Sequence, residues 1–109
     1  LITNGLRDVQ RPRLAGSAIR DCFEEVIISE EIGAAKPDPA IFDAAFERLG
    51  RPQRAQVLLV GDSLTSDIAG GRRYGLDTCW FNPTGAARAA DATSTYEIRH
   101  LSELARLLL

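Results

Sequence analysis

The chain has little of several residue types, and each shortage argues against a class of protein. Thirteen Lys and Arg stand against fifteen Asp and Glu in 109 residues, so the basic footprint of a nucleic-acid-binding protein is absent. No apolar run approaches the roughly 20 residues of a membrane span, and no signal-peptide pattern opens the sequence. Two distant cysteines, Cys22 and Cys79, favour a reducing cytoplasm over a disulfide scaffold. We therefore expect a cytoplasmic protein with neither nucleic-acid nor membrane partners.

Methionine is absent, which indicates that residue 1 is not a translational start. Leu1 and Ile2 form an apolar run shorter than the usual strand of about 5–6 residues, and a turn signal ending at Gly5 follows at once. We interpret Leu1 as lying inside a strand that begins earlier. The composition, 45% hydrophobic and 26% charged, is that of an ordinary globular domain.

Two kinds of element alternate along the chain. Strands are expected where apolar and β-branched residues run together, at residues 24–29, 56–60, 77–81 and 96–99. Helices are expected where apolar residues recur at helical spacing, at residues 39–49, 66–74 and 101–109. Residues 6–20 predict only a poor helix, interrupted by Pro12. The alternation predicts an α/β fold with a parallel sheet, in which ligands lie beyond the carboxyl ends of the strands.

Polar residues follow the first two expected strands. Thr3, Asn4 and Gly5 offer a hydroxyl, an amide and a glycine whose backbone N–H can approach an anion closely. Lys36, the only lysine of the chain, lies in a loop of small residues. Taken alone, Thr3 and Asn4 are typical of a turn, and Lys36 is as typical of the protein surface as of a binding site. Their convergence at strand ends favours a site for phosphoryl transfer.

Two carboxylates follow the third expected strand. Asp62 comes directly after it, and Asp67 follows five residues later in the first turn of the next helix. Hard oxygen ligands with open positions suit Mg²⁺, which keeps several waters and bridges to phosphate. The alternative is that the polar residues of this loop merely cap the helix, whose N-terminal dipole favours Asp67 in any case.

Three segments resemble motifs of a known family. LITNG, AAKPDPAIF and LLVGDSLTSDIAGGRRYGLDTCWFNP are similar to the second, third and fourth motifs of the haloacid dehalogenase-like (HAD) hydrolase superfamily, in the family's order. The last segment most resembles the phosphatase branch that contains pyrimidine 5′-nucleotidases and N-acylneuraminate phosphatases. The resemblance implies a Rossmann-like parallel sheet with flanking helices. It also implies Mg²⁺-dependent hydrolysis of a small phosphorylated metabolite, such as a nucleoside monophosphate, through an aspartyl-phosphate.

The resemblance also implies roles for the residues at the strand ends. Thr3 would hydrogen-bond the transferring phosphoryl group, with Asn4 and Gly5 framing it, and Lys36 would neutralise the charge shared by nucleophile and phosphate. Thr3, Asn4 and Lys36 are thus the expected catalytic residues.

The same resemblance implies a metal site in the third loop. Asp62 would bind Mg²⁺ directly, Asp67 would hold it directly or through water, and Ser63 would orient one of these acids. Dehalogenases of the superfamily do without a metal, so the two aspartates favour a phosphatase.

The sequence departs from the family pattern in two ways. The D-x-D motif that would supply the nucleophile is absent, and so is the cap domain that would select the substrate. We therefore expect residues 1–109 to be the C-terminal portion of a HAD-like core that lacks its first strand and cap, and to be inactive alone. The alternatives are a receiver-type phosphoacceptor domain and a catalytically inactive binding domain. The order of Thr3, Lys36 and the two aspartates argues against a receiver. The oligomeric state stays open.

Overall fold

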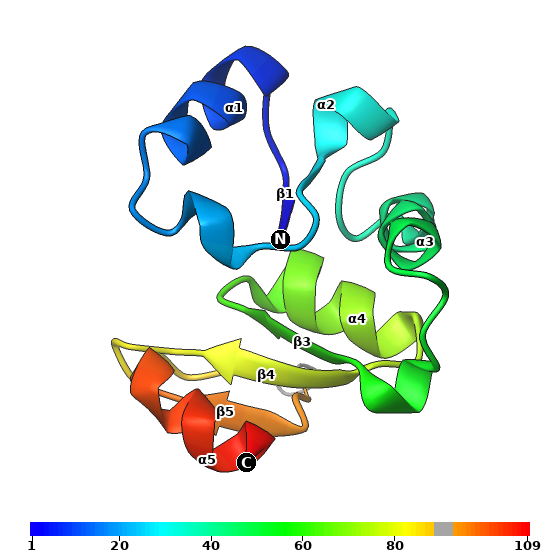
Figure 1. Cartoon of the computed structure of the whole chain (residues 1–109). Helices are drawn as coiled ribbons and strands as arrows, with labels where there is room; N and C mark the ends of the chain where they lie inside the picture. The colour runs from blue at the N-terminus through cyan, green and yellow to red at the C-terminus, as the bar shows by residue number, and fades with distance from the viewer. Residues whose placement is uncertain (89–92) are drawn as a thin grey trace. The chain divides into compact units, whose positions relative to one another are not determined.

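Strands and helices alternate along the chain, and all paired strands run parallel (Figure 1). A computed structural model describes residues 1–88 and 93–109. The chain divides into two units, Leu1–Pro52 and Gln53–Leu109, which are described in turn. The prediction of an α/β fold with parallel strands is therefore confirmed, with one parallel sheet in each unit.

The first unit has a two-stranded sheet. Strand β1 spans Ile2–Thr3 and β2 spans Ile27–Ile28, in a register that pairs Ile2 with Ile27. The helical elements of this unit are α1 (Arg7–Ala15), η1 (Arg20–Cys22), α2 (Ser29–Ile32) and α3 (Pro39–Arg48). The second strand is shorter than the expected run of residues 24–29, because β1 offers only two residues for it to pair with.

Helix α3 forms for the reasons that the sequence indicates. Asp38 caps it by accepting a hydrogen bond from the backbone N–H of Ala40 at 2.9 Å, with Pro39 at the first helical position. Gly50 adopts a left-handed φ of 80° just after the helix, which other residues rarely adopt. The face turned to the core buries Ile41, Phe42 and Ala45. The expected bounds of this helix are thus close to the observed ones.

Helix α1 is more regular than the sequence predicts. It continues through Pro12, and the carbonyl of that residue accepts a hydrogen bond from the N–H of Gly16 at 3.0 Å. None of its residues is buried. The expected interruption at Pro12 is therefore wrong: the proline removes one donor, but the hydrogen bonds on either side of it still form.

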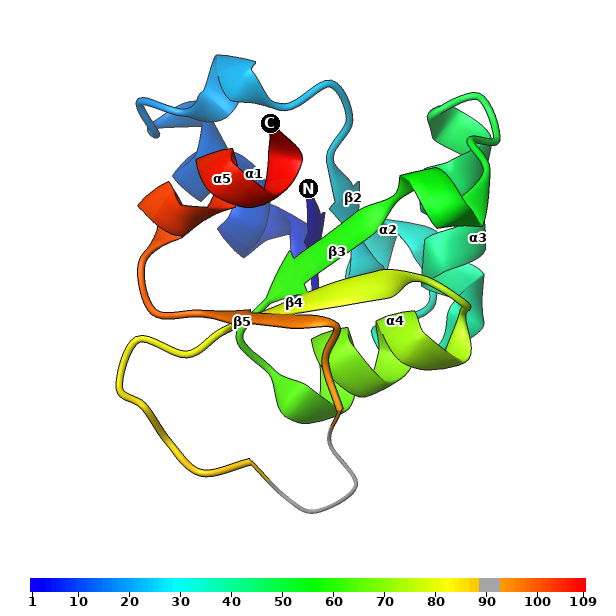
Figure 2. The same ribbon diagram turned by 90° about the horizontal axis from the view of Figure 1, so that it is seen from below.

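The second unit has a three-stranded sheet in the order β3–β4–β5 (Figure 2). Its strands are β3 (Leu58–Gly61), β4 (Asp77–Phe81) and β5 (Tyr96–Ile98). Its helical elements are η2 (Arg54–Gln56), η3 (Leu64–Ile68), α4 (Ala69–Arg73), η4 (Leu101–Glu103) and α5 (Leu104–Leu108). Helices α4 and α5 lie on opposite faces of this sheet (Figure 2).

The helix expected at residues 66–74 begins earlier and has two parts. The backbone N–H groups of Asp67 and Ile68 both donate to the carbonyl of Ser63 at 3.0 Å, so the first part, η3, is a π-helical turn. The second part, α4, packs closely on the sheet: a Cβ at Gly71 would lie 2.6 Å from Cδ2 of Leu59. This close approach explains a glycine inside a helix.

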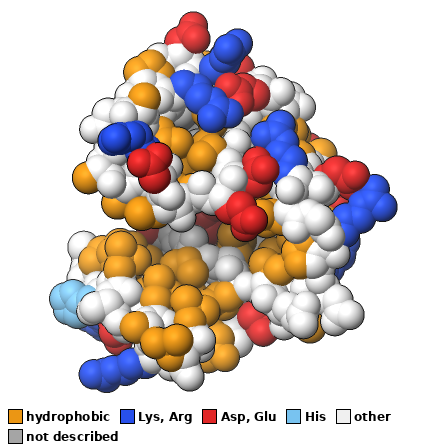
Figure 3. All heavy atoms as spheres, in the orientation of Figure 1, with side chains coloured by type: hydrophobic (Ala, Val, Ile, Leu, Met, Phe, Trp, Pro, Cys, Tyr) orange, Lys and Arg blue, Asp and Glu red, His pale blue; other side chains and the backbone are white. Residues whose placement is uncertain are grey.

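The surface of the second unit carries apolar side chains over α5 and β5 (Figure 3). The exposed ones are Tyr96, Leu101, Leu107, Leu108 and Leu109. The apolar side expected for the C-terminal helix is therefore present but is not buried. Within the described ranges, no helix is both long and apolar enough to cross a membrane.

Candidate active site

Asn4 joins the two predicted site loops of the first unit. Its side-chain Oδ1 accepts a hydrogen bond from the backbone N–H of Lys36 at 2.8 Å, and its Nδ2 donates to the carbonyl of Lys36 at 3.1 Å. The side-chain amide of Asn4 thus pairs with both the N–H and the carbonyl of Lys36, as the main chain of a neighbouring strand would. The sequence predicts that Asn4 and Lys36 converge, and the structure brings them together through the main chain of Lys36.

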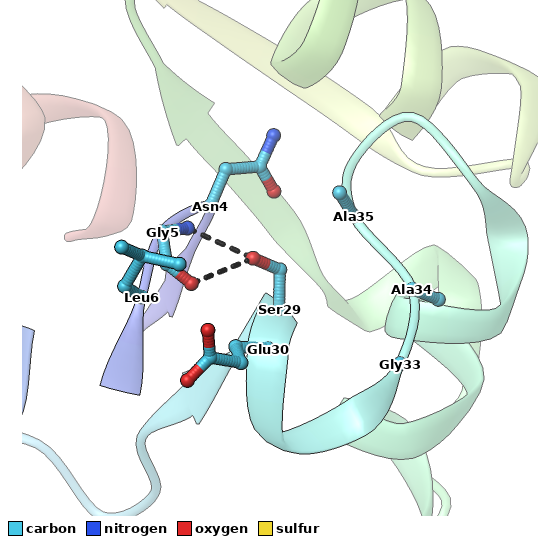
Figure 4. A pocket seen from close by; sticks show the side chains of 8 residues that line it. All are labelled: Asn4, Gly5, Leu6, Ser29, Glu30, Gly33, Ala34 and Ala35. Atoms are coloured by element: carbon cyan, nitrogen blue, oxygen red, sulfur yellow. Dashed lines mark hydrogen bonds between the residues drawn. The ribbon is translucent and has the colours of Figure 1, made fainter. Parts of the chain in front are cut away.

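Ser29 holds the main chain of Gly5 (Figure 4). Its hydroxyl accepts from the N–H of Gly5 at 2.8 Å and donates to the carbonyl of the same residue at 3.1 Å. The N–H that the sequence offers to an anion is therefore already engaged. An open hollow of about 560 Å³ lies beside these groups, lined by Asn4, Gly5, Leu6, Ser29, Glu30, Gly33, Ala34 and Ala35.

Gln10 of α1 packs against the loop that follows β1. Its Nε2 donates to Oγ1 of Thr3 at 2.9 Å and to the carbonyl of Asn4 at 3.3 Å. A Cβ at Gly5 would lie 2.9 Å from Cγ of Gln10, so only glycine fits there without a shift. Gln10 and Ser29 were not singled out from the sequence, because nothing local marks either as a partner of this loop.

The two predicted metal ligands of the second unit lie in different surroundings. Asp62, just after β3, is exposed, whereas Asp67 of η3 is only 4% exposed. One carboxylate oxygen of Asp67 accepts from the backbone N–H of Ser63 at 3.1 Å. The same carboxylate fills the space that a Cβ at Gly61 would need. Gly61 therefore leaves room for the Asp67 side chain at the end of β3.

Ser63 has two roles in this loop. Its hydroxyl accepts from the backbone N–H of Ser66 at 3.1 Å and so caps η3, as the alternative interpretation of the sequence expects. Its own backbone N–H holds Asp67. Ser63 thus caps the helical turn through its hydroxyl and contacts the Asp67 carboxylate through its main chain.

Trp80 contributes a contact that the sequence does not reveal. It lies in β4 and is 4% exposed. Its indole Nε1 also donates to the carbonyl oxygen of Asp62 at 3.0 Å. The hydrogen bond spans 18 residues of sequence, so no local pattern indicates it.

Other candidate groups differ in their surroundings. Cys79 is buried, and burial raises the pKa of its thiol, with the charge of Glu103 raising it further. A thiol in such surroundings is a poor nucleophile. His100 is exposed and immediately precedes η4, and a carboxylate oxygen of Glu103 accepts a hydrogen bond from its backbone N–H at 2.9 Å.

The donor set around Asp62 and Asp67 fits a hard cation that keeps water ligands. Among residues 1–88 and 93–109, no three His, Cys, Asp or Glu side chains gather into a cluster that would enclose a metal ion. Mg²⁺ is commonly bound by one or two carboxylates together with waters and substrate phosphate. An exposed Asp62 and an Asp67 seated against a glycine meet that requirement.

Parallel strands flanked by helices, and a loop with two aspartates after β3, are features that the resemblance to HAD-like hydrolases predicts. Residues 1–75 match the family model of haloacid dehalogenase-like hydrolases, and the chain belongs to that family.

The chain is similar over its whole length to proteins of known name. It is 44% identical to the pyrimidine 5′-nucleotidase YjjG of Escherichia coli (strain K12) and 41% identical to the HAD-hydrolase YfnB of Bacillus subtilis (strain 168), over 99% of this chain. It spans about half of their length, 48% and 46%. The crystal structure of YfnB bound to magnesium superposes with a TM-score of 0.94, covering 98% of this chain and 47% of that one.

Proposed function

We propose that the protein hydrolyses phosphate monoesters with the help of Mg²⁺, acting on a small phosphorylated metabolite such as a nucleoside monophosphate. The observation that carries the proposal is the structure of the loop after β3. The buried carboxylate of Asp67 accepts a hydrogen bond from the N–H of Ser63 and occupies the space left by the missing side chain of Gly61. Asp62, five residues earlier in the same loop, is exposed. Family membership supports hydrolysis. The name of a relative, pyrimidine 5′-nucleotidase, supports the substrate class.

In this proposal the second unit holds the metal. Asp62 binds Mg²⁺ directly, and Asp67 binds it directly or through a water, with the backbone N–H of Ser63 fixing one of its oxygens. Bound Mg²⁺ neutralises charge on the phosphate and on the oxygens that gain charge in the transition state.

The first unit supplies the phosphate-binding groups. The Thr3 hydroxyl donates to the phosphoryl group, and Lys36 balances its negative charge. Asn4 contributes by holding the backbone of Lys36. Gly5 contributes by leaving room for the side chain of Gln10 and by donating its N–H to the Ser29 hydroxyl. The nucleophilic aspartate that the family resemblance implies is not among these 109 residues, so we expect them to be inactive alone.

The test is phosphate release from nucleoside monophosphates by the enzyme that includes this sequence, with and without Mg²⁺. Asp62→Asn keeps the size of the side chain and removes its charge, so we expect activity to fall by about 100-fold or more. Asp77→Asn is the matched control, because Asp77 is an exposed aspartate at the opposite end of the neighbouring strand. Full activity of Asp62→Asn, or loss of activity in the control alone, would remove the metal role from Asp62.

A further inference from the structure

Trp80 links strand β4 to the loop that carries the proposed metal ligands. Its indole N–H donates to the main-chain carbonyl of Asp62 at 3.0 Å, and the side chain is 4% exposed. We propose that Trp80 is a positioning residue: by holding the carbonyl of Asp62 it sets the direction in which the Asp62 carboxylate leaves the strand. The inference rests on the proposed function, because it assumes that Asp62 binds Mg²⁺.

The sheet register explains why the indole reaches this carbonyl. Trp80 pairs with Gly61, the last residue of β3, and Asp62 is the next residue along. Paired residues of neighbouring strands place their side chains on the same face. Because Gly61 has no side chain, its part of that face is open, and the Asp67 carboxylate occupies it.

The face that Trp80 shares is the one covered by α4. Thr78 lies two residues before Trp80 in the same strand, so their side chains point to the same side. A Cβ at Gly71 of α4 would lie 3.0 Å from Cγ2 of Thr78, which identifies this side as the helix-covered face. The indole is therefore packed beneath the helical layer and has little freedom to move.

Because the indole is buried, breaking its hydrogen bond to Asp62 would cost free energy. An indole ring has one hydrogen-bond donor, its N–H, and no acceptor. A buried donor without a partner lowers the stability of the fold. Asp62 lies one residue beyond the end of β3, where the sheet ladder no longer holds its carbonyl. The hydrogen bond from Trp80 thus fixes the main chain at Asp62, the residue that follows β3 and that is proposed to bind the metal.

The first experiment removes the donor and keeps the aromatic ring. Mg²⁺ affinity of the purified protein is measured by isothermal titration calorimetry for wild type and Trp80→Phe. We expect the Kd for Mg²⁺ to rise about 10-fold, the scale on which groups supporting a metal ligand act. Ile98→Val, which thins the buried core of the same sheet without touching Asp62, is the control: it lowers Tm and leaves the Kd within about twofold of wild type.

Equal Mg²⁺ affinity in wild type and Trp80→Phe overturns the inference and leaves the proposed function standing. An equal loss in Ile98→Val also overturns it, since general loosening of the sheet then explains the change. Wild-type protein that binds no Mg²⁺ overturns both the inference and the proposed metal site.

A second measurement needs no variant of Trp80 to fold. Trp80 is the only tryptophan of the chain, so the emission comes from this indole alone if the sequence is studied by itself, or after replacement of tryptophans elsewhere in a longer protein. We expect Mg²⁺ to shift the emission with the same Kd as calorimetry, and Asp62→Asn to abolish the shift. Mg²⁺ binding that leaves the emission unchanged contradicts the coupling.

Discussion

The loops that follow β1 and β3 stand at equivalent places in the fold but are held in different ways. The loop after β1 is held largely by distant partners: Gly5 by Ser29, 24 residues away, and Asn4 by Lys36, 32 residues away. Gln10 adds contacts over six and seven residues. The loop after β3 is held largely from within, since the contacts of Ser63 with Ser66 and Asp67 span three and four residues.

The difference teaches where each loop is vulnerable. A loop that carries most of its own hydrogen bonds is most sensitive to changes in its own close contacts, and Trp80 is the distant side chain on which the loop after β3 also depends. A loop held by distant side chains responds to changes far away in sequence.

Gly61→Ala alters the close contact between Gly61 and the Asp67 side chain in the loop after β3. The new Cβ would occupy the place of the Asp67 carboxylate, so either that side chain or the strand must move. Overpacking of this kind costs about 1–3 kcal/mol of stability. Displacement of Asp67 is expected to weaken Mg²⁺ binding by about 10-fold or more. Thermal unfolding and a calorimetric Mg²⁺ titration measure the two effects.

Gly16→Ala is the matched control for this substitution. A Cβ at Gly16 would meet its nearest neighbour, the carbonyl oxygen of Pro12, at 3.5 Å, an ordinary contact, and its φ of −84° suits any residue. We expect Tm and Mg²⁺ affinity to stay close to wild type. Unchanged Mg²⁺ affinity in Gly61→Ala would show that Asp67 does not need its observed position.

Ser29→Ala tests the loop after β1 from a distance. It removes both hydrogen bonds to Gly5 and leaves the N–H of that residue without its partner. The expected cost is about 1–3 kcal/mol of stability. Because the loop carries Thr3 and Asn4, KM for the phosphorylated substrate should rise while Mg²⁺ affinity stays unchanged. Steady-state kinetics and metal titration separate the two, and Ser102→Ala, at an exposed serine, is the control.

The same contrast decides what the sequence predicts and what it does not. Asp62, Ser63 and Asp67 lie within one short segment, so their spacing predicts a shared loop, and capping of the helix by its polar residues is the alternative that the sequence leaves open. Helix α3 also depends on local signals, and its expected range of residues 39–49 is close to the observed Pro39–Arg48.

Partners that are distant in sequence leave no such signal. The hydrogen bond of Ser29 to Gly5 and that of Trp80 to Asp62 follow from strand pairing, which brings residues together only after the sheets form. The sequence predicts an interruption of helix α1 at Pro12 because proline lacks a backbone N–H donor. The helix nevertheless continues, because the hydrogen bonds on either side of Pro12 still form.

Arg11→Ala removes an ion pair between α1 and α2 and is expected to change stability and KM little. The guanidinium of Arg11 in α1 lies 2.6 Å from the Glu31 carboxylate of α2, so this pair links the two helices that follow β1 and β2. Its hydrogen bond, with the added positive charge of Arg11, holds the pKa of Glu31 below its usual range. The lowered pKa contributes stability above the ordinary pKa of a glutamate, and that contribution is lost as pH falls through the folded value.

Both partners are exposed to solvent, where ion pairs contribute little to stability. In Arg11→Ala, an NMR titration should show the pKa of Glu31 moving up toward its usual value, while Tm at neutral pH and substrate KM stay near wild type. Arg13→Ala, on the same helix, should leave the pKa of Glu31 unchanged. A rise in KM in Arg11→Ala comparable to that in Ser29→Ala would contradict the contrast, because the loop after β1 would then depend on the helix pair as much as on the hydroxyl of Ser29.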